Sequence, residues 1–227
     1  MIVAFEGLDG SGKTSISKFL AKKYSFKYIR HPLQTFLDLP EDIYNHMCDK
    51  ICLKTDKEAQ ALFFLLGNKL GHLCGPKIIL DRNILSTYFY DEDHTTHPLF
   101  NSFTNSKIKP DLTFLLYSSP DKRTEHIRCR DPHDSDLCCT NKLIANYDSM
   151  IHYAKKIDLT YALINTDKIS TYDEVITCCD HIFSELLKAS SKIRKQACKI
   201  ICDYNKIESV AEYSNKLKTF SIHKIKF

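Results

Sequence analysis

A glycine-rich segment near the start of the chain most strongly restricts how the chain can fold. Residues 7–14 read GLDGSGKT and match the pattern G-x-x-x-x-G-K-[ST]. This pattern bends the backbone so that successive N–H groups converge on phosphate oxygens, while Lys13 adds a mobile charge and Thr14 a hydroxyl for Mg²⁺. An apolar run at 1–5 and a helical spacing of apolar residues at 16–24 flank the loop. A strand, a phosphate loop and a helix that bind a nucleoside triphosphate are therefore predicted. The loop residues expected to bind it are Gly7, Asp9, Gly10, Ser11, Gly12, Lys13, Thr14 and Ser15.

Four more apolar runs of strand length follow the first one, with helical patterns between them. Alternation of this kind is typical of parallel strands with helices on both faces of the sheet. We therefore expect an α/β fold, a three-layer sandwich built on a parallel five-stranded sheet. The expected strands are Ile2–Phe5, Lys27–Ile29, Ile78–Leu80, Leu112–Tyr117 and Tyr161–Ile164.

Polar side chains follow the first three expected strands directly. The phosphate loop follows the first strand, Arg30 the second, and Asp81 and Arg82 the third. Because ligands of open parallel sheets bind at the carboxyl ends of the strands, we expect these segments to meet at one edge. The segment 57–74 is predicted to be helical. The segment 91–109 is predicted to be a polar loop whose acidic run is solvated rather than bound to a metal.

The composition of the 227 residues suits one domain with an appendage. Residues 190–227 hold nine Lys or Arg against three Asp or Glu, so residues 1–189 have a net charge of about −2 in a chain whose net charge is +4. This distribution argues against nucleic-acid binding by the main domain. We place the main domain at 1–189 and a basic, helical extension at 190–227.

Cysteine usage and hydropathy predict the cellular compartment. The ten cysteines form no C-x-x-C pair, so a zinc site is not expected. No apolar stretch reaches the roughly 18 residues needed to cross a bilayer, and only six residues precede the loop, which leaves no room for a signal peptide. We therefore expect reduced thiols, no membrane association and a cytoplasmic protein.

Four passages of the chain together resemble the thymidylate kinase family of P-loop nucleoside monophosphate kinases, over about residues 1–188. They are Phe5–Thr14, Ile29–Pro32, Asp81–Tyr90 and Pro110–Thr113, of which the first and third are specific. The resemblance implies the P-loop nucleotide kinase fold. It also implies that ATP donates its γ-phosphoryl group to a deoxynucleoside 5′-monophosphate, with dTMP as the leading acceptor, for deoxynucleoside triphosphate synthesis. Mg²⁺ is the implied cofactor, and a homodimer is the implied assembly.

The residue types suit phosphoryl transfer, which depends mostly on positioning and charge neutralisation. Lys13 is expected to hold the donor phosphates, and Thr14 and Asp81 the metal, with Asp81 acting through a water. Arg82 and Arg30 are expected to grip the acceptor phosphate with their planar guanidinium groups. A purely structural ion pair between Asp81 and Arg82 is the alternative.

The resemblance also implies contacts with the acceptor nucleoside. Asp9 matches a carboxylate that faces the 3′-hydroxyl of the sugar. Tyr90 matches a tyrosine near the 2′ carbon, which implies a preference for deoxynucleotides, and a packing role is the alternative. The full set of expected acceptor residues is Asp9, Arg30, Phe64, Asn68, Lys69, Arg82, Ser86, Thr87 and Tyr90.

The helix implied to contact the base departs from the family pattern. That pattern has an aromatic residue followed by an arginine four positions later. Here Phe64 is followed by Asn68, or Leu65 by Lys69. The identity of the base is therefore left open.

Gly10 occupies a loop position where some family members carry an arginine. Members with glycine take the transition-state cation from a mobile lid, and this chain resembles that type. The lid is expected near 126–136, with Arg128 and Arg130 as the cations that close over the reacting phosphoryl group. Two solvated arginines on a helix end are the alternative.

Two other functions stay open on the sequence alone. A deoxynucleoside kinase shares the fold but needs a general base for its neutral acceptor, normally a carboxylate after the second strand. This chain has Arg30 and His31 there, which leaves Asp81 or Glu6 as candidates for the base. A catalytically inactive nucleotide-binding protein would be expected to have lost at least one of the phosphate-facing residues, and all of them are present.

Overall fold

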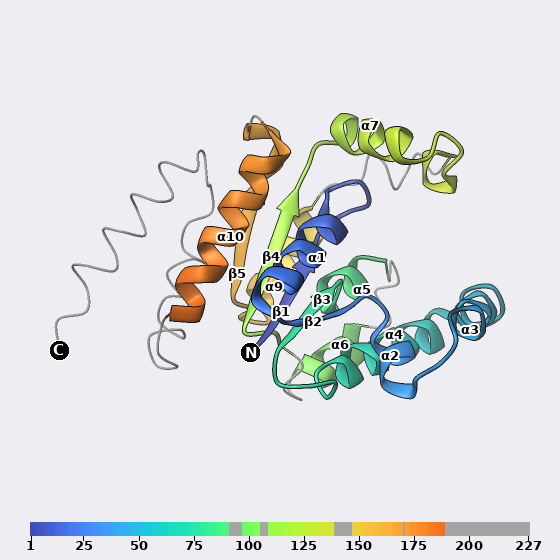
Figure 1. Cartoon of the computed structure of the whole chain (residues 1–227). Helices are drawn as coiled ribbons and strands as arrows, with labels where there is room; N and C mark the ends of the chain where they lie inside the picture. The colour runs from blue at the N-terminus through green and yellow to red at the C-terminus, as the bar shows by residue number, and fades with distance from the viewer. Residues whose placement is uncertain (91–96, 105–108, 139–146, 170, 189–227) are drawn as a thin grey trace. The chain divides into compact units, whose positions relative to one another are not determined.

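The computed structural model describes residues 1–90, 97–104, 109–138, 147–169 and 171–188. Its five strands form one sheet in the order β2-β3-β1-β4-β5 (Figure 1). The strands are β1 (Ile2–Glu6), β2 (Lys27–Ile29), β3 (Ile78–Asp81), β4 (Leu112–Tyr117) and β5 (Tyr161–Asn165). All of them lie where the apolar runs predicted them, and the predicted parallel α/β fold is confirmed.

Helices connect the strands in chain order. Those before β3 are α1 (Lys13–Tyr24), α2 (Pro32–Leu37), α3 (Glu41–Lys54) and α4 (Lys57–Gly71). Those between β3 and β5 are α5 (Ile84–Tyr90), α6 (His97–Thr104), α7 (Pro120–Arg130), the 3₁₀ helix η2 (Ser135–Cys138) and α9 (Asp148–Lys156). The 3₁₀ helix η3 (Thr166–Lys168) and α10 (Tyr172–Lys188) follow β5.

The chain forms two compact units. The first comprises Met1–Gly7, Lys13–Thr113 and Asn146–Thr160, and the second comprises Leu8–Gly12, Phe114–Ala145 and the chain from Tyr161 onward. The phosphate loop is therefore divided between them, with Gly7, Lys13 and Thr14 in the first unit. The predicted boundary at residue 189 and the helical extension beyond it lie outside the described residues.

Helices cover both faces of the strands in the first unit. There β3 pairs in parallel with both β1 and β2. Leu80 joins a buried apolar cluster on one face, and a Cβ atom added to Gly71 at the end of α4 would lie 3.3 Å from Leu80 Cδ2. Because side chains alternate along a strand, Asp81 points to the opposite face, where α1 contacts the strands.

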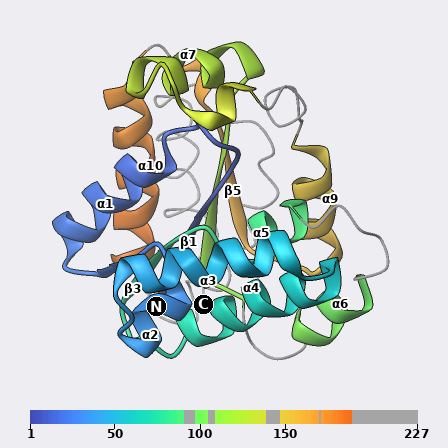
Figure 2. The same ribbon diagram turned by 90° about the vertical axis from the view of Figure 1, so that its right-hand side faces the viewer.

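Helix α4 is the centre of the helical layer in the first unit. It packs against α2, α3, α5 and α6, and Figure 2 shows α3 and α4 running side by side. The helix ends at Gly71, three residues before the predicted end, because the next residues close tighter turns. Several apolar side chains of α3, α4 and the turn after α4 remain exposed: Ile43 at 48%, Leu53 at 81%, Leu62 at 41%, Leu66 at 46% and Leu73 at 62%.

The prediction that 91–109 forms a polar loop is wrong for its central part, which forms α6. Phe100 of this helix is fully buried. Its ring meets those of Tyr88 and Tyr153 edge-on, at centroid distances of 5.3 and 6.0 Å. Burial of the Phe100 ring stabilises this helix although the neighbouring residues are polar, because a buried ring removes a large apolar area from water. The acidic run at 91–94 lies outside the described residues.

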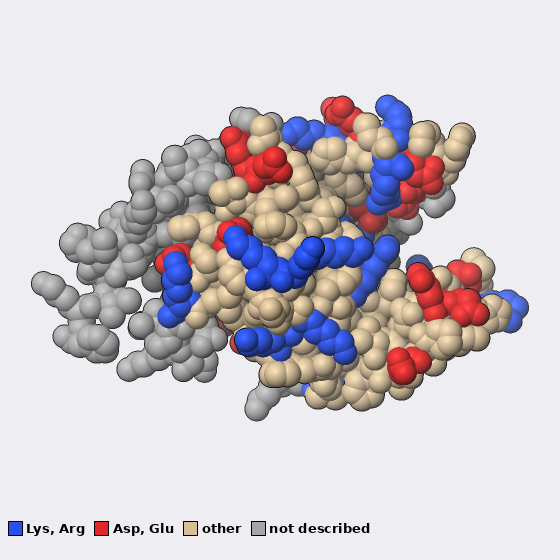
Figure 3. Space-filling view, in the orientation of Figure 1, with Lys and Arg blue, Asp and Glu red and all other residues tan. Residues whose placement is uncertain are grey.

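One group of basic side chains lies on α1. Lys and Arg side chains gather over α1 (Figure 3), which exposes Lys18, Lys22 and Lys23 and carries no acidic residue. Among the described helices, none has the length and apolar character that a bilayer span requires.

Candidate active site

The two predicted metal ligands lie in direct contact in the first unit. Thr14 stands in the first turn of α1, and Asp81 is the last residue of β3. The Thr14 hydroxyl Oγ1 donates a 2.6 Å hydrogen bond to Asp81 Oδ2, and Asp81 is only 2% exposed. Lys13 precedes Thr14 and is also buried. The sheet edge and the start of the helix thus bring the predicted phosphate and metal residues together.

These oxygen ligands fit a magnesium ion better than a transition metal. Mg²⁺ takes oxygen ligands and is usually held by one or two protein groups, with water and substrate phosphate completing its shell. Thr14 and Asp81 supply one hydroxyl and one carboxylate. No group of three or more His, Cys, Asp and Glu side chains in the described part of the chain could hold a metal by itself. The residues present therefore suit a metal that arrives with a nucleotide.

Arg82 follows β3 directly and adopts a left-handed backbone conformation, with φ of 79°. Its backbone N–H donates to Phe5 O at 2.9 Å, and its Nη1 donates to Gly7 O at 3.3 Å and to Ser86 Oγ at 3.1 Å. The guanidinium carbon lies 5.3 Å from the ring centroid of Tyr90. Such a conformation costs of order 1–3 kcal/mol in a residue other than glycine and persists where surrounding contacts enforce it. Three predicted acceptor residues are thus brought together.

Glu6 is buried beneath the start of α5 and acts as its cap. Its Oε1 accepts hydrogen bonds from the N–H groups of Asn83 and Leu85, both at 2.9 Å. Its Oε2 accepts from the N–H of Ser86 at 3.1 Å and from the Ser86 hydroxyl. Burial raises the pKa of Glu6, against the opposing effects of Ser86, the Arg82 guanidinium and the backbone N–H groups. The sequence leaves Glu6 open as a general base, whereas the structure gives both of its oxygens a structural role.

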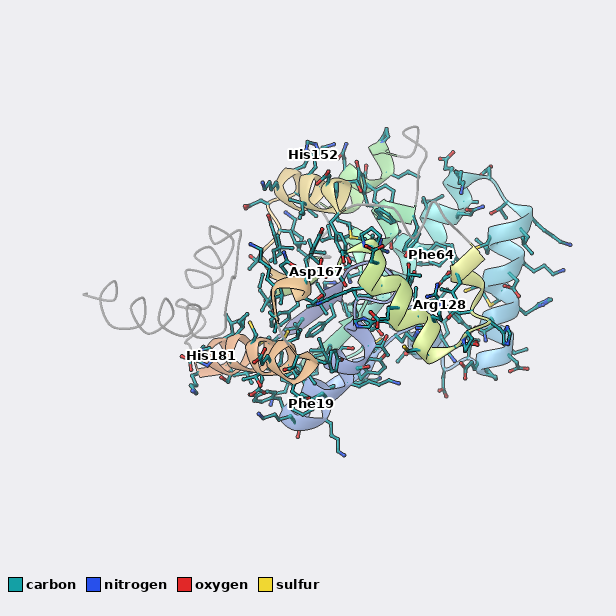
Figure 4. All side chains as sticks on the ribbon, turned by 90° about the horizontal axis from the view of Figure 1, so that it is seen from above. Phe19, Phe64, Arg128, His152, Asp167 and His181 are labelled. Carbon is teal, nitrogen blue, oxygen red and sulfur yellow. The ribbon has the colours of Figure 1, made fainter. Side chains whose placement is uncertain are left out.

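The base-contacting helix of the prediction is α4, and its Asn68 is tied to α5. Asn68 Nδ2 donates a 2.9 Å hydrogen bond to Thr87 Oγ1, and that hydroxyl in turn lies 3.3 Å from the backbone oxygen of Asn83. Phe64, one turn before Asn68, is 36% exposed and is seen in Figure 4. Leu65 is fully buried. The sequence left two pairs open, Phe64 with Asn68 and Leu65 with Lys69. Phe64 is more exposed than Leu65 and is therefore the more accessible of the two to a ligand.

In the second unit, the phosphate loop is held by contacts with its backbone. Gly10 and Gly12 have φ values of +82° and +86°. A Cβ atom on Gly10 would lie 2.5 Å from the backbone oxygen of Arg123 on α7. Nδ1 of His126, also on α7, is 2.8 Å from Gly10 O, and the Tyr172 hydroxyl donates to Gly12 O at 3.3 Å. Glycine at position 10 is thus required both by backbone conformation and by the approach of α7.

The predicted lid, 126–136, covers the end of α7 and the beginning of η2. Arg128 lies on the exposed surface of α7 (Figure 4) and forms no ion pair with the residues that the structure describes. Arg130 is paired with Asp134, four residues later. Arg123 is only 1% exposed and therefore cannot close over a substrate in this conformation. Of the cations considered, Arg128 has the freer side chain.

The remaining predicted residues are Ser15, Arg30, Lys69, Asp9 and Ser11. Arg30 and Ser15 are exposed and Lys69 is half-buried, all in the first unit. Asp9 and Ser11 belong to the second unit, where the Ser11 N–H donates to Leu8 O at 3.3 Å.

Sequence reasoning missed several residues that contact the predicted ones within each unit. The Tyr28 hydroxyl donates a 2.9 Å hydrogen bond to Asp81 Oδ2, and His126 and Tyr172 contact the glycine half of the loop. Asp167 of η3 (Figure 4) accepts hydrogen bonds from the Ser119 N–H at 3.1 and 2.9 Å, which anchors the start of α7. For Tyr28, the one signal in the sequence was a side chain with a hydroxyl group inside a three-residue strand.

The chain is similar in sequence to two proteins that are named as probable thymidylate kinases. No protein-family model matches the chain. It is 27% identical over 139 residues to a probable thymidylate kinase of Methanocaldococcus jannaschii, covering 58% of this chain and 71% of that protein. It is 28% identical over 141 residues to a probable thymidylate kinase of Archaeoglobus fulgidus, covering 57% and 70%.

Solved structures share the fold. The thymidylate kinase from Ehrlichia chaffeensis matches with a TM-score of 0.56 and 22% identity, over 81% of this chain and 98% of that one. The deoxyadenosine kinase from M. mycoides, solved with the products dCMP and dCDP, matches with a TM-score of 0.56 and 18% identity, over 82% and 100%. The protein is accordingly a phosphotransferase with the fold of the P-loop nucleotide kinases.

Proposed function

We propose that the protein transfers the γ-phosphoryl group of ATP to a deoxynucleoside 5′-monophosphate, with dTMP as the preferred acceptor, in the manner of a thymidylate kinase. The curated relatives carry that name. The chain also has the phosphate loop, the contact between Thr14 and Asp81, and an arginine fixed at the end of β3.

The hydrogen bonds made by the buried carboxylates of Glu6 and Asp81 favour a monophosphate over a nucleoside as the acceptor. A nucleoside hydroxyl must lose a proton to a general base, whereas a monophosphate is already an oxyanion and needs cations instead. Both oxygens of Glu6 are occupied by donors, and Asp81 accepts hydrogen bonds from two hydroxyl groups. Arg82 and Arg30 are present as cations. This combination favours the phosphate acceptor.

Each residue then has a distinct role. Lys13 holds the donor phosphates, and Thr14 and Asp81 hold the magnesium ion, Asp81 through a water. Bound Mg²⁺ supplies neutralisation of the charge on the donor phosphates. Arg82 binds the acceptor phosphate while Ser86 and the ring of Tyr90 keep its guanidinium in place. Arg30 supplies a second cation from the end of β2.

Two further roles concern the sugar and the lid. Asp9 faces the 3′-hydroxyl of the acceptor sugar, and Tyr90 crowds a 2′-hydroxyl, which gives a preference for deoxynucleotides. Because Gly10 provides no cation and Arg130 is paired with Asp134, Arg128 is the lid residue that stabilises the transferring phosphoryl group. Phe64 and Asn68 contact the acceptor base.

The protein acts as a homodimer in this proposal. Leu53 of α3 and Leu62 and Leu66 of α4 are exposed large apolar side chains of the first unit, and exposed apolar side chains that gather in a patch commonly mark an interface. Analytical ultracentrifugation tests this part separately, because a monomeric sedimentation coefficient at micromolar protein would contradict it.

The function is tested by measuring ADP formation from ATP with each of dTMP, dUMP, dCMP and dGMP, and with the corresponding nucleosides. We expect acceptor-dependent turnover that is fastest with dTMP and a loss of roughly 100- to 1,000-fold in Lys13→Ala. Lys22→Ala, at an exposed site on the same helix, is the matched control. Turnover with nucleosides but not monophosphates would instead identify a deoxynucleoside kinase, and no turnover with any acceptor would indicate a nucleotide-binding protein without activity.

A further inference from the structure

Asp81 receives a second hydrogen bond that the phosphate loop does not supply. The Tyr28 hydroxyl donates to Asp81 Oδ2 at 2.9 Å, and the Thr14 hydroxyl donates to the same oxygen at 2.6 Å. Tyr28 is half-buried and Asp81 is buried. A carboxylate oxygen has two lone pairs, so these two donors occupy Oδ2 completely.

The sheet register produces this contact. Tyr28 of β2 stands opposite Ile79 of β3 in the parallel pairing. Asp81 lies two residues after Ile79, and residues two apart on a strand share a face of the sheet. The face is the one that α1 covers, so Thr14 reaches Asp81 from the helix while Tyr28 reaches it from the neighbouring strand.

Tyr28 is the donor in this pair, and the Asp81 carboxylate oxygen is the acceptor. A hydrogen bond from a hydroxyl to an ionised carboxylate is stronger than a bond between neutral groups. The hydrogen bonds described for Asp81 all reach Oδ2, which leaves Oδ1 to accept from a water.

We propose that Tyr28 is a positioning residue for the divalent metal that accompanies the donor nucleotide. Its hydrogen bond to Oδ2 of Asp81, together with the one from Thr14, restricts rotation of the carboxylate and leaves Oδ1 to face metal-bound water. Groups that orient a metal-binding carboxylate through hydrogen bonds contribute substantially to metal affinity. This inference rests on the proposed function only in assigning Thr14 and Asp81 to the metal.

Tyr28→Phe removes the hydroxyl and keeps the ring, and it is compared with Tyr24→Phe, which removes a hydroxyl from α1 in the same unit. The first measurement is binding of Mn²⁺ to the protein with a non-hydrolysable ATP analogue, followed by the electron paramagnetic resonance signal of free Mn²⁺. We expect affinity to fall roughly 10-fold or more in Tyr28→Phe and to stay within about twofold in Tyr24→Phe. Unchanged Mn²⁺ affinity in Tyr28→Phe would overturn the proposal.

The second measurement is the dependence of the rate on Mg²⁺ concentration at saturating ATP and dTMP. The concentration for half-maximal rate should rise by a similar factor in Tyr28→Phe, while the rate at saturating Mg²⁺ stays within about threefold of wild type. A lower maximal rate with an unchanged Mg²⁺ dependence would contradict a metal-positioning role. Absence of turnover in wild type would refute the proposed function while the Mn²⁺ measurement still decides the role of Tyr28.

Discussion

The two parts of the phosphate loop are held by different kinds of contact. At the Lys13–Thr14 end, in the first unit, side chains form the contacts: a threonine hydroxyl and a tyrosine hydroxyl converge on one buried carboxylate. At the Leu8–Gly12 end, in the second unit, the backbone itself is the contact surface, and α7 approaches it where a side chain is missing. The first arrangement depends on the chemistry of particular groups, whereas the second depends on the absence of a Cβ atom.

This difference has a consequence for catalysis. In the proposed function, the glycine end of the loop has no charged side chain at position 10, so we expect the cation for the transferring phosphoryl group to come from the lid. At the Lys13–Thr14 end, the proposed metal ligands Thr14 and Asp81 and the proposed positioning residue Tyr28 are in contact with one another. Four substitutions test the comparison.

Arg128→Ala should have the largest effect, because a cation that stabilises the charge of the transition state contributes a large part of the rate. We expect kcat to fall at least about 100-fold with a small change in KM. Arg130→Ala, which removes the partner of Asp134, is the matched control and should stay within about threefold, since exposed ion pairs contribute little. Equal losses of kcat in both variants would contradict a role of Arg128 that Arg130 does not share.

Glu6→Gln tests the region held by side chains. The substitution replaces an acceptor oxygen by an NH₂ group that must face N–H donors at the start of α5, and we expect the free energy of unfolding to fall by about 3 kcal/mol. Chemical denaturation measures this change. Glu58→Gln, at an exposed position in the first turn of α4, should change stability by less than about 0.5 kcal/mol. A small effect of Glu6→Gln would mean that the cap contributes little.

Gly10→Ala tests the region held by backbone contact. An alanine there combines a left-handed backbone with a Cβ atom 2.5 Å from the Arg123 carbonyl oxygen. Gly75 has φ of +149° with no atom within 4 Å of an added Cβ, so Gly75→Ala is a control that strains a positive φ without a steric contact. We expect Gly10→Ala to lower the free energy of unfolding by about 2 kcal/mol more than Gly75→Ala. Equal losses of stability in the two variants would show that α7 moves away from an alanine at position 10 with no cost in free energy.

A smaller effect concerns pH in the first unit. Burial, with a contribution from Lys69, lowers the pKa of His72 to about 4 from its usual 6.5. The unfolded chain therefore binds a proton on acidification before the folded chain does, and stability should fall as the pH drops from about 6.5 towards 4, by at most about 1.4 kcal/mol per pH unit. Above pH 7 His72 contributes no slope. In urea unfolding at several pH values, His72→Gln should flatten this dependence, and an unchanged slope would assign it to other groups.

Some parts of the fold and of the candidate site could be predicted from the sequence, and others could not. All five strands and the phosphate loop were predictable, because continuous apolar runs and a fixed glycine spacing are local signals. The contact of Tyr28 with Asp81 was not, since it depends on the register between two strands, which no local pattern encodes. The cap formed by Glu6 and the approach of Arg123 to Gly10 join residues that are far apart along the chain. Helix α6 was missed because its formation depends on burying Phe100 edge-on against the stacked rings of Tyr88 and Tyr153.

The most direct test of the proposed acceptor compares dTMP with thymidine in wild type and in Arg82→Ala. The measurement is kcat/KM for ADP formation with each acceptor at saturating ATP and Mg²⁺. We predict that wild type uses dTMP at least about 100-fold better than thymidine and that Arg82→Ala loses most of this preference. A wild-type protein that phosphorylates thymidine as well as dTMP, or an Arg82→Ala variant with unchanged discrimination, would contradict a site built around an acceptor phosphate.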